Sequence, residues 1–267
     1  KELLHQAISA AVLAGAEILK VYHSDDFEVE FKNDNSPLTK ADRLANSCIE
    51  NVLSSTAIPI LSEEGREIPY MERKEWAKLW IVDPLDGTKE FIKRNGEFTV
   101  NIALVKEGAP VLGVVYVPDS KVLYYGLIGA GSFKIKLGQY NIDSILELGI
   151  VKLIDMSDRL PAEVSGDVFK VVGSRSHMTK ETKEYIEHLS EKHSNVEVVS
   201  AGSAIKLCLV AEGVADEYPR FAPTMEWDTA AGHAIANQAG KKVFAYGTQK
   251  ELTYNRENNV NGWFLVK

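Results

Sequence analysis

Cysteine and long apolar runs are scarce in this chain of 267 residues. Its two cysteines, Cys48 and Cys208, exclude a disulfide scaffold and a cysteine-rich zinc site. Both lie in apolar helical patterns, which indicates buried free thiols. The N-terminal stretch lacks the pattern of a signal peptide, and we expect no apolar run long enough to span a bilayer. These absences predict a cytoplasmic protein with no transmembrane segment.

Positive charge is also in deficit, with 30 Lys and Arg against 38 Asp and Glu, a net charge of −8. This balance argues against binding a nucleic acid polymer and against a basic membrane anchor, although peripheral association with the inner membrane surface stays open. A small anionic substrate remains compatible, because a few local cations or metal ions outweigh the global charge. The 45% hydrophobic content predicts a folded chain with a sizeable core, and it leaves the oligomeric state open.

Two amphipathic helices open the chain. Apolar residues recur at helical spacing over 2–22 and again over 41–53. Thr39 stands at the expected N-cap of the second helix, with Asp42 three residues later in a capping-box arrangement. Short apolar strands follow at 58–61 and 79–82, and each runs directly into acidic residues.

The remaining pattern predicts two halves. Strands at 98–105, 111–117, 122–125 and 131–136, joined by short loops, indicate an antiparallel sheet. Residues 137–167 are polar and irregular. Beyond them, strands at 169–172, 196–199, 214–218 and 242–244 alternate with helices near 179–190, 203–211 and 227–239. The fold class is therefore α/β, with an α+β catalytic domain at 1–150 and a smaller α/β substrate-binding domain at 151–267.

The most informative segment is 83–88. An apolar strand ends in Asp83, a proline blocks its continuation, and Asp86, Gly87 and Thr88 form a turn. Two carboxylates and a hydroxyl are thus expected at one strand end, where a glycine permits close approach of the backbone to a ligand. A plain turn built on Asp86 and Gly87 explains the same residues equally well.

Further carboxylates stand at the ends of other elements. Glu63 and Glu64 follow the strand at 58–61, and Asp228 lies in the first turn of the helix at 227–239. Asp228 complements a helix dipole and Asp42 a capping box, so each has a structural explanation. Together they form an oxygen-only set of the kind that suits Mg²⁺, and paired Mg²⁺ ions suit phosphoryl transfer.

These motifs carry a family resemblance. Residues 83–101, with 63–64 upstream and 227–232 downstream, resemble the inositol monophosphatase superfamily of Mg²⁺-dependent, lithium-sensitive phosphatases. Within it, they are similar to the CysQ branch, the bacterial 3′(2′),5′-bisphosphate nucleotidases, and residues 35–42 and 218–221 agree. The resemblance implies a layered αβαβα sandwich of the sugar-phosphatase type.

The resemblance also implies roles for the acidic residues. Glu63 would bind metal, Asp83 would bridge two Mg²⁺ ions, and Leu85 would offer its backbone carbonyl to one of them. Asp86 and Asp228 would hold the other ion. Asp42 and Thr88 would orient the attacking water, with a third, weakly held ion near Asp42 left open.

Substrate contacts are expected mainly from the second half. Ser203 is a natural N-cap for the helix at 203–211, and Lys206 either extends to solvent or neutralises a phosphate. A lone histidine such as His177 is more often structural than functional. By resemblance, the nucleotide contacts are as follows: Gly87, Thr88, Ser174, His177, Gly202, Lys206 and Arg220.

The implied reaction is in-line attack of a metal-activated water on 3′-phosphoadenosine 5′-phosphate, giving AMP and phosphate. The sulfated relative, 3′-phosphoadenosine 5′-phosphosulfate, would fit the same site, which links the enzyme to sulfate assimilation. Three alternatives stay open: another phosphatase of the superfamily acting on inositol phosphate or fructose 1,6-bisphosphate, a non-catalytic nucleotide sensor, and a structural role. The complete carboxylate set argues against the last two.

Overall fold

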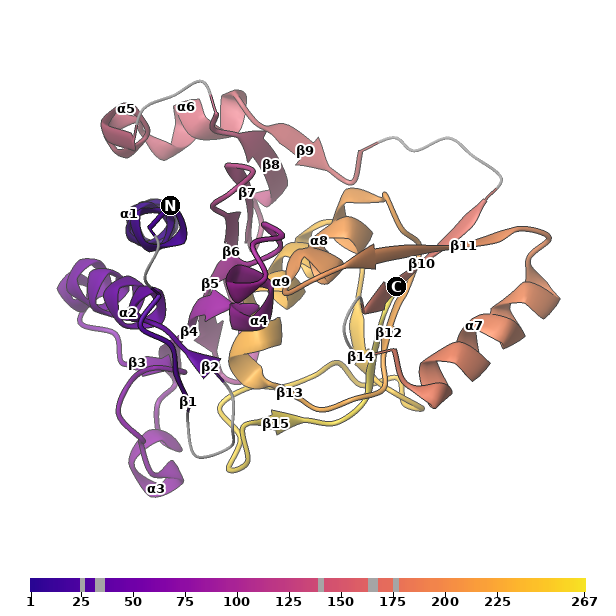
Figure 1. The fold of residues 1–267 in the computed structure, drawn as a ribbon. Helices are drawn as coiled ribbons and strands as arrows, with labels where there is room; N and C mark the ends of the chain where they lie inside the picture. The colour runs from indigo at the N-terminus through magenta and orange to yellow at the C-terminus, as the bar shows by residue number, and fades with distance from the viewer. Residues whose placement is uncertain (25–26, 32–36, 139–141, 163–167, 175–177) are drawn as a thin grey trace.

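The computed structural model describes residues 1–24, 27–31, 37–138, 142–162, 168–174 and 178–267. Its elements stack in five layers, α-β-α-β-α (Figure 1). Two N-terminal helices, α1 (Glu2–Tyr22) and α2 (Lys40–Leu53), cover one face of a large sheet. Helices α8 (Ile205–Glu212) and α9 (Glu226–Gln238) cover the other. The predicted fold class is confirmed.

The large sheet has seven strands in the order β3-β4-β5-β6-β7-β8-β9. Strands β3 and β4 are parallel and every other pair is antiparallel, as the short loops predict. The strands are β3 (Ile60–Ser62), β4 (Lys78–Asp86), β5 (Thr99–Lys106), β6 (Ala109–Val117), β7 (Val122–Leu127), β8 (Gly131–Lys136) and β9 (Asp158–Leu160).

Alternation along β4 explains why helices cover both faces of this sheet. Trp80 and Val82 pack into the core beneath α1 and α2, whereas Leu79 and Ile81 pack into the core beneath α8 and α9. Successive side chains of a strand point to opposite faces, so a continuous apolar strand needs a layer on each side. The ends of β3 and β4 are thereby held rigidly between two hydrophobic cores.

Strand β4 also corrects one expectation. Pro84 does not end the strand, because β4 continues to Asp86. The pairing of β4 with β5 shifts register between Asp83 and Asp86, so Pro84 falls at an irregularity where its missing N–H costs no ladder hydrogen bond. Asp83 and Asp86 therefore both belong to the strand.

Helix α1 corrects a second expectation. By length and composition alone it is apolar enough to cross a membrane, contrary to the prediction that no run is that long. Half of its most apolar window is buried inside the fold, and the helix packs against α2 and β6. Leu4, Ala11 and Ile18 are fully buried in the core, so α1 is placed here as a core helix.

The region between the two halves is more regular than expected. Residues 137–167 contain α5 (Ile142–Glu147), α6 (Ile150–Asp155) and β9, which pairs with β8 and extends the large sheet. The sequence pattern does not predict these elements because the region is mostly polar. Only Ile145, Leu153 and Leu160 are buried in them.

The second half adds small sheets and an outer helix. Strands β10 (Phe169–Ser174) and β11 (Val196–Ala201) are parallel, and β12 (Tyr218–Arg220), β16 (Phe264–Val266) and β14 (Val243–Ala245) form an antiparallel sheet. The strand expected at 214–218 is displaced to β12 (Tyr218–Arg220). Helix α8 ends at Glu212 with Gly213 as its C-cap, and the chain then passes β10, where Asp216 N donates to Lys170 O. The outermost layer is α7 (Lys180–Lys192).

Several short elements complete the described chain. They are β1 (Glu30–Phe31), β2 (Pro37–Leu38), η1 (Ser54–Thr56), α3 (Tyr70–Arg73), α4 (Thr88–Ile92), β13 (Thr224–Met225) and β15 (Val260–Asn261). Strand β1 pairs with β2, and β13 pairs with β15.

Candidate active site

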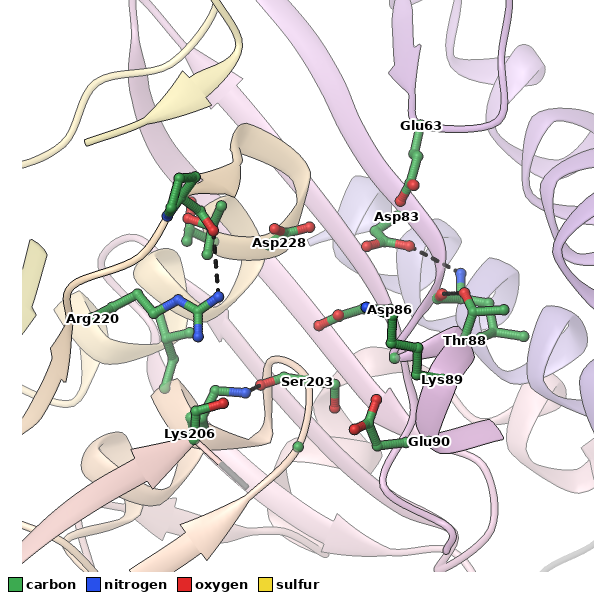
Figure 2. A pocket seen from close by; sticks show the side chains of 18 of the residues that line it. Glu63, Asp83, Asp86, Thr88, Lys89, Glu90, Ser203, Lys206, Arg220 and Asp228 are labelled. Atoms are coloured by element: carbon green, nitrogen blue, oxygen red, sulfur yellow. Dashed lines mark hydrogen bonds between the residues drawn. The ribbon is translucent and has the colours of Figure 1, made fainter. Parts of the chain in front are cut away.

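A cavity of about 400 Å³ lies where the two halves of the chain meet. The ends of β3 and β4 and the start of α4 form one side, and the loop before α8, strand β12 and the start of α9 form the other (Figure 2). The predicted residues that line it are Glu63, Asp83, Leu85, Asp86, Gly87, Thr88, Ser174, Gly202, Lys206, Arg220 and Asp228. His177 lies outside the described residues.

Three carboxylates converge in this cavity. One oxygen each of Glu63, Asp83 and Asp228 lies within 4.8 Å of the other two. Glu63 follows β3, Asp83 lies in β4, and Asp228 lies in the first turn of α9, so three elements from distant parts of the sequence supply the cluster. Asp86, the fourth predicted acidic ligand, lines the cavity but lies outside this group.

Burial and mutual repulsion make this cluster costly in its ionised form. Burial, followed by the charge of Glu63, raises the pKa of Asp83 well above its ordinary value. Burial, followed by the charge of Asp86, raises the pKa of Asp228 to about 8. A cation among these oxygens would remove the repulsion, and hard oxygen donors of this kind fit Mg²⁺.

Asp86 faces a different set of partners. It accepts a hydrogen bond from Asn101 Nδ2 at 3.3 Å. Burial raises its pKa, whereas the nearby charge of Lys206 opposes that shift. Asp86 thus connects the acidic side of the cavity to its cationic side.

Asp42 reaches the cavity through Thr88. The Thr88 hydroxyl lies 3.3 Å from Asp42 Oδ1 and 3.3 Å from the carbonyl oxygen of Leu85. Gly87 turns the chain between β4 and α4 with a φ of 92°, and a Cβ there would meet the carbonyl oxygen of Glu97 at 3.0 Å. Only glycine fits this turn without strain, so Gly87 places Thr88 beside Asp42.

Two cations lie on the opposite side of the cavity from Glu63 (Figure 2). Lys206 is buried in α8, where its ammonium donates to the carbonyl oxygen of Ser203, so it does not extend to solvent. Burial lowers the pKa of Lys206 to about 8, against the opposing charge of Asp86. Arg220, in β12, donates through Nη2 to the carbonyl oxygen of Pro223 at 3.3 Å.

The cationic side retains unused hydrogen-bonding groups. Within the described part of the chain, neither Ser203 Oγ nor Arg220 Nε has a hydrogen-bond partner, and both atoms are buried. Buried polar groups without partners are costly, and a ligand in the cavity would satisfy them. The prediction that Ser203 caps α8 is wrong, since Ala204 is the N-cap and Ser203 adopts a φ of 41°.

Some residues of the site carry no predicted role, and Glu90 and Asn101 are two of them. Glu90 is only 8% exposed and lines the cavity near Lys206, and Asn101 binds Asp86 from the neighbouring strand. Both belong to the segment 83–101 that carries the resemblance. Their contacts depend on how α4 folds back and on the β4–β5 register, neither of which sequence spacing reveals.

Known proteins match this chain along nearly its whole length. The model of the inositol monophosphatase family matches residues 1–262. The 3′(2′),5′-bisphosphate nucleotidase CysQ of Shigella flexneri is 45% identical over 271 residues, covering 99% of each chain. The Escherichia coli K12 protein of the same name is 44% identical, with the same coverage.

Solved structures give the same result. The crystal structure of CysQ from Bacteroides thetaiotaomicron, described as a bacterial member of the inositol monophosphatase family, is 52% identical with a TM-score of 0.91. The match covers 100% of this chain and 97% of that one. The suhB protein of Bartonella henselae, at 24% identity and a TM-score of 0.74, shares the fold.

Proposed function

The chain belongs to the inositol monophosphatase family, and we propose that it is a Mg²⁺-dependent 3′(2′),5′-bisphosphate nucleotidase. The proposed substrate is 3′-phosphoadenosine 5′-phosphate, which yields AMP and phosphate, and the sulfated relative is a second substrate. This activity fits a role in sulfate assimilation. The nucleotidases that match at 44–45% identity over 99% of their length support the substrate class.

One observation carries the proposal. A single cavity holds the carboxylate cluster on one side and two cations, Lys206 and Arg220, on the other. A substrate with two phosphates matches this division, since one phosphate can lie among cluster-bound metal ions while the other meets fixed positive charge. A substrate with a single phosphate leaves one side of the cavity without a counter-charge.

We assign the metal ligands as follows. Glu63, Asp83 and the Leu85 carbonyl would hold one Mg²⁺, and Asp83, Asp86 and Asp228 would hold a second. When bound, Mg²⁺ neutralises the carboxylates and the phosphate oxygens and lowers the pKa of water. The converging oxygens of Glu63, Asp83 and Asp228 support the assignment of these three residues most directly.

The chain's own residues would order the reaction. Thr88 donates its proton toward Asp42, which leaves a hydroxyl lone pair to accept a proton from water and aim that water at the 3′-phosphorus. The P–O3′ bond breaks as the P–O(water) bond forms, and the 3′ oxygen takes a proton to give AMP. Lys206 and Arg220, with Ser174, Gly202 and His177, would bind the rest of the nucleotide and provide remote binding energy.

We retain the division into a metal-binding half at 1–150 and a substrate-binding half at 151–267, and a cytoplasmic location. Peripheral association with a membrane, which the sequence left open, finds no support in the described residues, where the one helix of spanning length is the core helix α1.

The deciding experiment is phosphate release with Mg²⁺ from four substrates side by side. They are 3′-phosphoadenosine 5′-phosphate, its phosphosulfate analogue, inositol 1-phosphate and fructose 1,6-bisphosphate. We expect a strong preference for the two nucleotides, abolished by EDTA. Preference for inositol 1-phosphate or fructose 1,6-bisphosphate would overturn the substrate assignment, and nucleotide binding without turnover would favour a sensor.

A further inference from the structure

The carboxylate cluster joins two separate parts of the fold. Glu63 and Asp83 come from the large sheet, whereas Asp228 comes from α9 in the other half of the chain. Carboxylates within 4.8 Å of one another repel each other when they are ionised, which opposes the contact between α9 and the sheet. Contacts elsewhere must hold the N-terminus of α9 in place.

Residues on both sides of Asp228 are fixed by the loop at 255–261. Glu226, which is fully buried, accepts hydrogen bonds from Asn255 N at 2.7 Å and from Arg256 N and Nε at 3.0 Å each. Asn261 Nδ2 donates to the carbonyl oxygen of Met225 at 2.8 Å and to Thr229 Oγ1 at 3.0 Å. The position of Asp228 therefore depends on the position of this loop.

Arg73 attaches the same loop to the segment that follows Glu63. Its side chain is 2% exposed, and Nη1 donates to Asn255 Oδ1 at 2.9 Å and to the carbonyl oxygen of Arg256 at 2.6 Å. Nη2 donates to the carbonyl oxygen of Glu257 at 3.2 Å, and the Arg73 carbonyl accepts from Asn255 Nδ2 at 2.8 Å. In Figure 1, the loop before β15 lies beside α3.

Arg73 also binds its own segment. Its Nε donates to the carbonyl oxygen of Ile68 at 3.4 Å, within the stretch that connects Glu63 to α3. A short path of hydrogen bonds and backbone therefore runs from Glu63 through Arg73 and Asn255 to Glu226 and Asp228. A buried guanidinium with this many acceptors is rigid, because each donor is fixed in one planar fork.

We infer that Arg73, Asn255 and Glu226 are positioning residues that hold Asp228 against Glu63 and so set the affinity of the cluster for a divalent cation. This inference rests on the metal site of the proposed function. Among the hydrogen bonds of the described residues, those of Arg73 reach none of the three carboxylates of the cluster, and Arg73 acts through the segment at 255–261. Groups that orient metal ligands from outside typically change metal affinity by 10- to 100-fold when they are lost.

The test is calorimetric titration of the full, nucleotide-free protein with Mn²⁺. We expect the Kd of Arg73→Gln to rise about tenfold or more. Asn255→Gly should give a rise of the same order, and it suits the backbone because Asn255 has a φ of 62°, which glycine adopts freely. Arg66→Gln is the matched control, since Arg66 lies in the same segment but bonds only to the exposed Glu72 in the described contacts.

Unfolding temperature in EDTA is recorded for each variant. A variant that loses stability but binds Mn²⁺ with the wild-type Kd would overturn the inference, because a purely structural role predicts that result. If Arg73→Gln does not fold, the Kd of the Asn255→Gly variant for Mn²⁺ is the measurement that tests the inference.

Wild-type turnover separates this inference from the proposed function. Wild-type protein that binds Mn²⁺ but releases no phosphate from any substrate would contradict the proposed function and leave the inference about metal affinity unaffected. Wild-type protein that binds no Mn²⁺ would contradict both the proposed function and the inference.

Discussion

The hydroxyl of Thr88 lies 3.3 Å from Oδ1 of Asp42, so the first turns of α4 and α2 meet at the edge of the cavity. The other oxygen, Oδ2, accepts from Thr39 N at 2.7 Å and Thr39 Oγ1 at 2.6 Å in the capping box of α2. The structural and functional interpretations of Asp42 are therefore compatible. One oxygen fixes the helix, and the fixed helix presents the other oxygen to Thr88.

Thr88→Val should abolish most turnover while leaving the fold intact. Valine keeps the shape of the side chain but removes the hydroxyl that would orient water, and positioned proton-transfer groups contribute roughly 10²–10⁴-fold to rates. The measurement is kcat at saturating Mg²⁺, together with the unfolding temperature. Thr88→Ser keeps the hydroxyl and should retain activity within about tenfold. A Thr88→Val enzyme as active as Thr88→Ser would remove Thr88 from the reaction.

Asp86→Asn should weaken metal binding at one of the two proposed positions and not at the other. Asp86 lies outside the group of convergent oxygens from Glu63, Asp83 and Asp228. The amide should therefore weaken the binding of one ion and leave the binding of the other unchanged. We expect nearly complete loss of turnover and a fall from two bound Mn²⁺ to one in a titration. The exposed Asp155→Asn should change neither. Two tightly bound ions in Asp86→Asn would contradict the assignment.

The metal-free protein should lose stability as the pH rises. The pKa of Asp228 is raised to about 8 in the folded chain, against an ordinary value of 3.8, so the folded state keeps a proton that the unfolded state releases. The stabilisation this proton gives is complete below about pH 4 and disappears as the pH passes through 8. Added Mg²⁺ should reverse the loss, because cation binding displaces the proton.

Thermal unfolding at pH 5.5 and 8.5, with EDTA or with Mg²⁺, measures this effect. The gain in unfolding temperature from Mg²⁺ should be larger at pH 8.5. Asp228→Asn cannot lose that proton, so its stability in EDTA should depend less on pH. An equal Mg²⁺ effect at both pH values in the wild type would contradict the linkage.

Sequence reasoning located the carboxylates well because their positions follow from local rules. Strand periodicity finds the ends of β3 and β4, and the capping pattern finds the start of α2. Asp83 and Asp42 are therefore visible in a short window. The same windows misplace Pro84, since an irregularity in strand pairing depends on the neighbouring strand β5.

The remaining features of the site arise from contacts between distant residues. Whether Lys206 extends to solvent or is buried depends on Tyr218 and Asp86, which come from other elements. Arg73 bonds to Asn255 across 182 positions in sequence, so no spacing pattern indicates it. Segments of the chain that lie far apart are brought together only by the packing of the layers.

Lys206→Met should impair use of the second phosphate. A charge-assisted hydrogen bond contributes about 1.5–3 kcal/mol, or roughly 10- to 100-fold in kcat/KM. The measurement is kcat/KM for 3′-phosphoadenosine 5′-phosphate and for adenosine 3′-phosphate, which lacks the 5′-phosphate. The loss should be larger for the bisphosphate, and the exposed Lys93→Met should leave both values unchanged. Equal losses on the two substrates would mean that Lys206 acts through Asp86 instead.

Gly113→Ala should destabilise the fold and move α9. A Cβ at Gly113, in β6, would lie 2.1 Å from the carbonyl oxygen of Ala231 in α9, so helix and sheet must separate. Overpacking of this kind costs about 1–3 kcal/mol. Urea unfolding measures the loss, and Gly149→Ala, where a Cβ meets no atom within 4 Å, is the control. Because α9 carries Asp228, the folded variant should also need more Mg²⁺ for half-maximal activity. A destabilised Gly113→Ala protein with wild-type Mg²⁺ dependence would show that Asp228 keeps its place when α9 shifts.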